Sequence, residues 1–193
     1  MKKLIYIIPI LTLVFAIVMW AILPDVVPTH FGASGKVDAY GSKNLLFVIP
    51  FVSISFILLS KTESQKNQVI YVLSMTFLFY IEIIMGLSMK NPDQDIIGLI
   101  FVGFGLIMTI TGFILPSIVT SKNVGIRTKW TLRNEDVWER THQFARIIFI
   151  AAGLLEIVLS LVLNGAFRFL VLMVVVVLAV LIPTVFSYAI SGK

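Results

Sequence analysis

The chain has 193 residues, of which 59% are hydrophobic and only 13% are charged. Soluble domains average about 45–50% apolar and about 25% charged residues, so this composition excludes an ordinary water-soluble fold and indicates an integral membrane protein. The absence of cysteine excludes disulfides, thiolate catalysis and thiolate metal sites. The net charge of +5 does not by itself indicate nucleic-acid binding, because membrane proteins retain Lys and Arg on their inner side.

Six apolar runs approach the length of about 20 residues that a membrane-spanning helix needs. They are residues 4–23, 44–60, 69–89, 96–119, 144–163 and 168–190. The first is longer than the core of a signal peptide and lacks a small-residue cleavage site, so we interpret it as a helix that is retained. Lipid offers the backbone no hydrogen-bond partner, so each span must be helical. The sequence predicts an all-α fold, a polytopic bundle of six transmembrane helices in a single membrane domain, residues 1–193.

The distribution of Lys and Arg predicts the orientation of this bundle. If the N-terminus is inside, eleven of the fifteen Lys and Arg residues fall in inner segments and four in outer segments. The positive-inside rule therefore predicts cytoplasmic N- and C-termini, an outer loop at residues 24–43 and an inner connector at 120–143. The expected location is the cell membrane, which the chain crosses several times.

The outer loop is rich in proline and glycine, which predicts a compact, ordered path with several turns. One interpretation is a loop that caps the helices and satisfies its own backbone. The alternative is a surface that binds a ligand or a metal. The candidate ligand-facing residues are Pro28, His30, Gly35, Asp38, Tyr40 and Lys43.

Two carboxylates, Glu82 and Glu156, lie within apolar spans, twelve or thirteen residues from the predicted start of each span. In the predicted topology both reach nearly the same depth. Ionisable groups inside a membrane are costly and are functional hypotheses by default. The two carboxylates could bind a cation or relay a proton, face His30 or Arg168 at the outer side, or accept hydrogen bonds from hydroxyls of neighbouring helices.

The inner connector is the most polar part of the chain, with eight charged side chains between residues 123 and 146. Asn134 has the character of an N-cap, so the fifth membrane helix should begin near residue 135 and extend about two turns into the cytoplasm, with Asp136 and Arg140 paired. Two interpretations remain open: an interfacial segment whose Arg side chains bind lipid phosphates, or a docking surface for a partner. The candidate residues are Gly125, Arg127, Thr128, Trp130, Thr131, Trp138, Thr141 and His142.

Enzyme motifs are absent from the sequence. The two histidines, His30 and His142, fall on opposite sides of the membrane in the predicted topology, so they cannot form a metal pair. No nucleophile elbow, phosphate-binding loop or Ser-Lys dyad is present. We predict no catalytic residue, no metal site and no cofactor; an intramembrane enzyme acting through Glu82 and Glu156 is the minor alternative.

Two long, irregular segments carry a family resemblance. The first is Gly125-Ile126-Arg127-Thr128-x-Trp130-Thr131-Leu132 followed by Val137-Trp138-x-x-Thr141-His142. The second is Leu23-Pro24-Asp25-x-x-Pro28-x-His30-Phe31-x-Ala33-Ser34-Gly35-x-Val37-Asp38-x-Tyr40-Gly41-Ser42-Lys43. The first segment resembles the signature of the SdpI-like family of bacterial membrane proteins, and the second resembles the N-terminal region that accompanies it.

This resemblance implies a protein that protects its producer from a secreted antimicrobial peptide toxin. It also implies signalling, by capture of a cytoplasmic winged-helix repressor of the ArsR type at the inner face of the membrane. The expected partners are therefore the lipid bilayer, a peptide toxin at the outer loop and the repressor at the inner connector, with no direct contact to nucleic acid. The alternative from the residues alone is a small proton- or ion-coupled transporter that uses Glu82 and Glu156.

Overall fold

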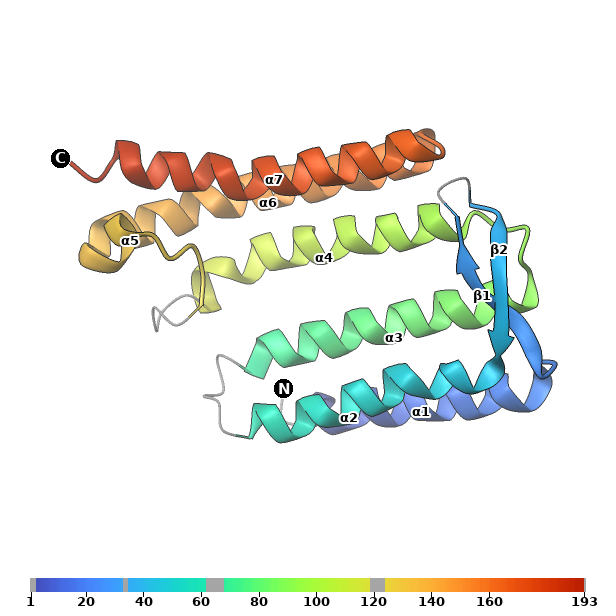
Figure 1. Cartoon of the computed structure of the whole chain (residues 1–193). Helices are drawn as coiled ribbons and strands as arrows, with labels where there is room; N and C mark the ends of the chain where they lie inside the picture. The colour runs from blue at the N-terminus through green and yellow to red at the C-terminus, as the bar shows by residue number, and fades with distance from the viewer. Residues whose placement is uncertain (1–2, 33–34, 62–67, 119–123, 193) are drawn as a thin grey trace. The chain divides into compact units, whose positions relative to one another are not determined.

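A computed structural model describes residues 3–32, 35–61, 68–118 and 124–192 (Figure 1). Within these residues, six helices are long and apolar enough to cross a membrane, which confirms the all-α, multi-pass membrane fold. Residues 33–34 of the outer loop and 120–123 of the inner connector lie outside the described residues. The cytoplasmic location of the termini and the single membrane domain remain predictions.

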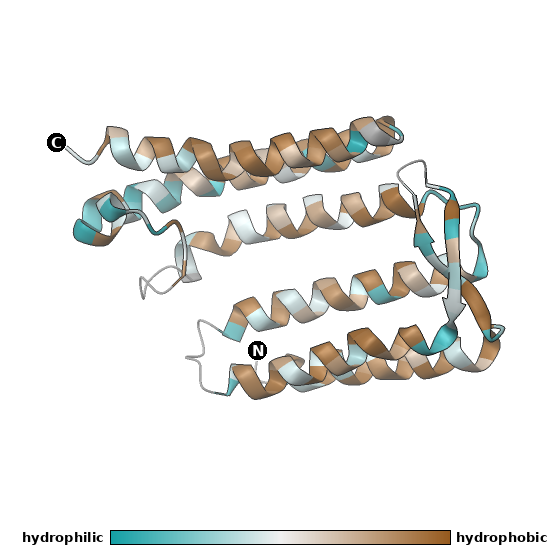
Figure 2. Cartoon of the chain, viewed as in Figure 1, coloured by the Kyte–Doolittle hydropathy of each residue, from teal (hydrophilic) through white to brown (hydrophobic). Residues whose placement is uncertain are grey.

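The chain divides into two compact units, residues 1–103 with 164–166, and residues 104–163 with 167–193. Figure 2 shows hydrophobic residues along most of the length of the long helices, whereas hydrophilic residues gather on a β-hairpin and around the short helix α5 (Lys129–Arg133). The elements of the first unit are α1 (Leu4–Ile22), β1 (Val26–Phe31), β2 (Val37–Ser42), the 3-10 helix η1 (Lys43–Phe47), α2 (Val48–Ser60), α3 (Gln68–Lys90) and the start of α4 (Ile96–Ile118).

The second span is built in two parts, because the regular α-helix α2 has only 13 residues. The five residues of η1 precede it directly. A 3-10 helix rises about 2.0 Å per residue and an α-helix about 1.5 Å, so η1 and α2 together extend about 30 Å, the thickness of a bilayer core. The tighter helix therefore gives this short span its length.

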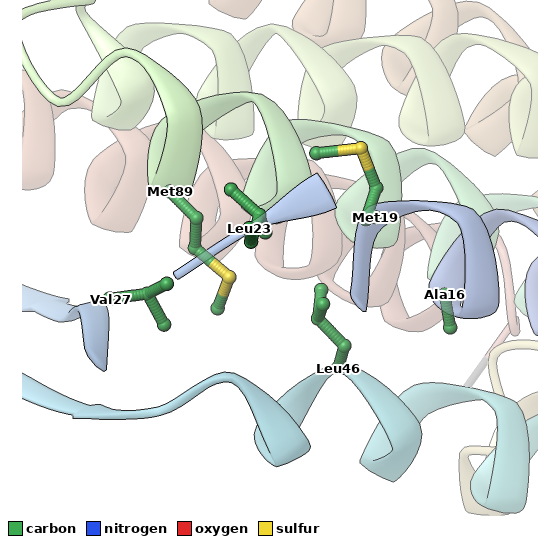
Figure 3. Close-up of a cluster of buried hydrophobic side chains, with 6 residues drawn as sticks. All are labelled: Ala16, Met19, Leu23, Val27, Leu46 and Met89. Atoms are coloured by element: carbon green, nitrogen blue, oxygen red, sulfur yellow. The ribbon is translucent and has the colours of Figure 1, made fainter. Parts of the chain in front are cut away.

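Two apolar clusters form the core of the first unit. The hairpin-end cluster joins the end of α1, β1, η1 and the end of α3 (Figure 3). Its buried members are Ala16, Met19, Leu23, Val27, Leu46 and Met89. The second, here called the Met75 cluster, has Ile5, Ile8 and Met75 as buried members, with Phe56 of α2 packed against it. Each of α1, α2 and α3 contacts the other two.

Glycines set the closest helix packing in the second unit, which contains the rest of α4, α5 (Lys129–Arg133), α6 (Glu135–Val162) and α7 (Ala166–Ala189). A Cβ placed on Gly105 of α4 would lie 2.7 Å from the carbonyl oxygen of Gly153 of α6. A Cβ on Gly112 would lie 2.8 Å from a side-chain carbon of Ile150. Helices in lipid associate through such small residues, because these allow the backbones to approach closely.

Helix α6 is longer than a membrane span requires. Its 28 residues extend about 42 Å, against about 30 Å for the hydrocarbon core. It begins at Glu135, directly after the N-cap Asn134, whose side chain accepts from the backbone N–H groups of Asp136 and Val137. Arg140 also pairs with Asp136 at 3.4 Å. The predicted start, cap and ion pair of this helix are confirmed.

Candidate functional site

The outer loop folds as an antiparallel β-hairpin that the sequence did not predict as strands. Strand β1 pairs with β2 with register shifts on both sides of His30, so the pairing is irregular there. The His30 ring hydrogen-bonds the Asp38 carboxylate, and both side chains are at least half exposed. Tyr40 is 65% exposed, whereas Pro28 is buried. Gly35 has a φ of 80°, the left-handed conformation that glycine adopts without strain.

Lys43 is held by several groups of the first unit at once. Its ammonium donates to the carbonyl oxygen of Leu23 at 3.0 Å and pairs with Asp25 at 3.1 Å. It also lies 4.6 Å from the centroid of the Trp20 ring, a cation–π contact. Trp20 in turn donates to Asn44 at 2.8 Å. Only 14% of the Lys43 side chain is exposed, so this residue fastens the end of α1 to the start of η1.

A cavity of about 540 Å³ lies in the first unit between β2 and the turn that precedes α4. Its lining includes two carboxylates, two amides, a lysine and a phenol. The lining residues are Gly35, Lys36, Val37, Tyr40, Pro92, Asp93, Gln94, Asp95 and Asn164. Of the predicted outer-loop residues, Gly35 and Tyr40 therefore line this cavity, whereas Pro28, His30, Asp38 and Lys43 do not.

The described part of the inner connector folds into a tight turn that opens α5. Thr128 is the N-cap, and its hydroxyl accepts from the backbone N–H of Thr131 at 3.1 Å. The Thr131 hydroxyl accepts in return from the backbone N–H of Thr128 at 2.9 Å and donates to the carbonyl oxygen of Ile126 at 2.8 Å. This reciprocal pattern is a capping box in which a second threonine stands where Glu or Gln is usual.

His142 of α6 holds the start of this turn. The backbone N–H of Ile126 donates to Nε2 of His142 at 2.9 Å. Nδ1 of the same ring lies 2.7 Å from the carbonyl oxygen of Trp138, which can only accept. The two partners assign the neutral ring with its hydrogen on Nδ1, since Nε2 must offer a lone pair. The side chain is 1% exposed, so His142 is an internal fastener between the turn and α6.

The tryptophans of the connector also pack within the second unit. Trp138 is buried and lies 4.3 Å from the His142 ring, centroid to centroid. Trp130 lies 5.0 Å from the ring of Tyr188 on α7. The Thr128 hydroxyl is within 3.3 Å of the Ser187 hydroxyl, also on α7. The turn is thus attached to both α6 and α7.

Burial separates the predicted connector residues into two groups. Thr131, Trp138, Thr141 and His142 are buried, and Thr128 and Trp130 are partly buried. Gly125, whose φ is 123°, and Arg127 are exposed. Four further cationic side chains of α5 and α6 are also exposed: Lys129, Arg133, Arg140 and Arg146. The buried group shapes the turn, and the exposed group forms its surface.

The two intramembrane carboxylates lie in different units and are both fully buried. Glu82 belongs to the first unit, and neither of its oxygens has a hydrogen-bond partner among the described residues. Glu156 belongs to the second unit and accepts from the Ser160 hydroxyl at 3.2 Å, on its own helix rather than on a neighbouring one. Within the described residues, no three or more His, Asp or Glu side chains are grouped so that they could hold a metal ion.

Two family models match separate parts of the chain. The model of the SdpI/YfhL protein family matches residues 120–187, which contain the connector, α6 and α7. A domain of unknown function (DUF1648) matches residues 7–54, which contain most of α1, the hairpin, η1 and the first half of α2. The immunity protein SdpI of Bacillus subtilis (strain 168) is 32% identical to the chain, over 97% of the chain and 95% of that protein. The chain belongs to the SdpI family. No solved structure matches this family member.

Sequence reasoning missed several groups that complete these sites in the SdpI-family chain. The backbone N–H of Ile126 and the hydroxyl of Ser187 carry no pattern that would mark them as partners of His142 and Thr128. Thr12 and Ser53, which are buried in the first unit, were also missed. Their signal was available, because both lie at helical spacing from apolar residues that the core buries.

Proposed function

We propose that this chain is a membrane immunity protein that protects the cell from a secreted peptide toxin. The observation that carries the proposal is the 32% identity to the immunity protein SdpI, which extends over 97% of the chain. Identity along almost the whole length supports a shared activity more strongly than a match to one segment would. The outer hairpin is the proposed toxin-facing surface, because His30, Asp38 and Tyr40 present exposed polar groups there.

Survival of a toxin-sensitive strain tests this function directly. Cells that express the chain should survive toxin challenge, whereas cells with an empty vector should not. The double change His30→Ala and Asp38→Ala should lower survival at equal membrane abundance, because it removes the exposed hydrogen-bonded pair. Lys90→Ala, an exposed change outside the hairpin, is the matched control and should leave survival unchanged. If the unmodified chain gives no protection, the immunity function is refuted.

The finer part of the proposal is signalling at the inner connector. We propose that its exposed cationic side chains bind a cytoplasmic winged-helix repressor when toxin is present, while the buried residues keep the turn in shape. Arg127→Ala and Arg133→Ala should then reduce the amount of repressor recovered with membranes. Gln143→Ala, an exposed neutral change on α6, is the control. Unchanged recovery in both arginine variants would remove the connector from signalling and leave immunity untouched.

The second candidate function is a small proton- or ion-coupled transporter. The observation that favours it is the complete burial of both Glu82 and Glu156, since ionisable groups within membranes often mark ion pathways. Purified protein in liposomes should then show pH-dependent flux that Glu82→Gln or Glu156→Gln abolishes. No flux over a wide range of pH would reject the transporter.

A further inference from the structure

The core of the first unit has an apolar cluster toward each end and buried polar side chains between the two clusters. The hairpin-end cluster lies at one end of α1, α2 and α3, and the Met75 cluster lies toward the other. Between them, each helix contributes one buried polar side chain: Thr12 from α1, Ser53 from α2 and Glu82 from α3. All three side chains are 0% exposed. We call these three residues the polar layer.

Helical spacing places the polar layer on the core-facing sides of α1 and α3. Thr12 lies four residues after Ile8 of the Met75 cluster and four before Ala16 of the hairpin-end cluster. Glu82 lies seven residues after Met75 and seven before Met89 of the hairpin-end cluster. Residues four or seven apart share one face of an α-helix. Both side chains therefore point into the same core as the two clusters, at a level between them.

The same reasoning places Ser53. It lies three residues before Phe56 on α2, which packs on the Met75 cluster, and between Phe56 and Leu46 of the hairpin-end cluster along the chain. Since α1, α2 and α3 all contact one another, we infer that the three polar side chains lie near the same level of one three-helix core, between the two clusters. Sequence reasoning considered Glu82 only with Glu156, whereas the fold places it with two hydroxyls.

The polar layer has unused hydrogen-bonding capacity. Among the described residues, the two oxygens of Glu82 and the hydroxyl of Ser53 have no hydrogen-bond partner. The Thr12 hydroxyl donates to the carbonyl oxygen of Ile8 at 2.9 Å, which leaves its lone pairs available. Buried polar groups without partners are rare in folded proteins, and each needs an explanation such as a bound ion or water. A buried carboxylate is either protonated or balanced by a positive charge nearby.

We propose that Thr12, Ser53 and Glu82 form a buried site for one monovalent metal cation. The donors are a carboxylate and two hydroxyls, which are the hard oxygen ligands that alkali cations prefer. One carboxylate balances a single positive charge, whereas protein sites for divalent cations usually contain several. The site draws on three helices, so an ion bound there holds α1, α2 and α3 together. The proposal does not depend on the immunity function.

The test is the thermal unfolding of the full chain in lipid nanodiscs, in sodium chloride and in choline chloride at the same ionic strength and pH. A ligand that binds only the folded state stabilises it in proportion to the logarithm of its concentration. At sodium about a hundredfold above its dissociation constant, the midpoint should rise by about 5–10 °C. Glu82→Gln should abolish this rise, because the neutral amide no longer balances the charge. Ser53→Ala should reduce it.

Glu156→Gln is the matched control, since it removes the other buried carboxylate, and it should keep the full sodium effect. If Glu82→Gln does not fold, the comparison of Ser53→Ala with Glu156→Gln decides the question. Equal midpoints in sodium and choline for the unmodified chain would overturn the proposal, and so would an undiminished rise in Ser53→Ala. A midpoint that depends on Glu82 and on pH, but not on sodium, would assign the charge to a proton and also overturn the metal site.

Discussion

The substitution His142→Ala tests whether the connector turn is held by the imidazole. In the native protein Nε2 of His142 accepts from the backbone N–H of Ile126 at 2.9 Å, and the ring packs 4.3 Å from Trp138. Alanine removes the acceptor and leaves the amide of Ile126 without its partner inside the turn. It also leaves a void beside Trp138, because the site is 1% exposed.

The orphaned amide determines the minimum cost. The Ile126 bond is partly buried; leaving such a donor unsatisfied costs up to about 1–3 kcal/mol, and the void beside the buried ring adds to this. Since each 1.4 kcal/mol is a factor of ten in an equilibrium constant, the turn should open about 5- to 150-fold more often. Opening at this level is local, because the hydrogen bonds of Thr128 and Thr131 are made within the turn itself.

Hydrogen–deuterium exchange of the protein in nanodiscs measures this opening. A peptide that covers residues 124–131 should exchange about 5- to 150-fold faster in His142→Ala than in the native chain. Gln143→Ala, an exposed neighbour on the same helix, should exchange at the native rate. Native exchange in His142→Ala, with Gln143→Ala as reference, would refute the role of the ring as a fastener.

Three further predictions concern packing, capping and orientation. Gly153→Ala should destabilise the protein by about 1–3 kcal/mol in thermal unfolding, because a Cβ there would lie 2.5 Å from a backbone oxygen of α4. The control Ala151→Ser, an exposed change on the same helix, should cost less than about 0.5 kcal/mol in the same measurement. Asn134→Ala should lower the stability by about 0.5–2 kcal/mol by loss of the cap, whereas Asn134→Asp should retain most of the native stability. Equal stability of the two variants would exclude the capping role. The chain has no cysteine, so a single introduced cysteine reports its own side of the membrane. Tyr40→Cys should react with an impermeant maleimide on intact cells, and Arg133→Cys should react only after lysis. The opposite pattern would reverse the predicted orientation.

The membrane class and the six spans follow from composition and hydrophobic run length, because lipid requires each span to satisfy its own backbone. The start of α6 could also be predicted, because Asn134 and the acidic residues after it are a local N-cap signal. The hairpin was not predicted as strands. Its register shifts around His30 interrupt the regular alternation of side chains that marks a strand in a sequence.

The candidate site was predicted less completely than the fold. The sequence singled out His142 and Thr131, but it could not indicate that they face inward, because burial depends on what packs against them. The structure places His142 against Ile126, a residue that offers only its backbone N–H. Lys43 likewise has the appearance of a ligand-facing cation in the sequence, whereas in the fold it bonds Leu23 and Asp25.

What the sequence determined by itself is local in origin: the length of each apolar run, the charge bias between loops and the cap at Asn134. These depend on residues close together in the chain and on the bilayer as a solvent. What only the tertiary structure decided is which distant groups meet. The joining of His142 to the connector turn and the gathering of Thr12, Ser53 and Glu82 at one level depend on how separate segments pack, because a buried polar group is satisfied by neighbours in space rather than in sequence.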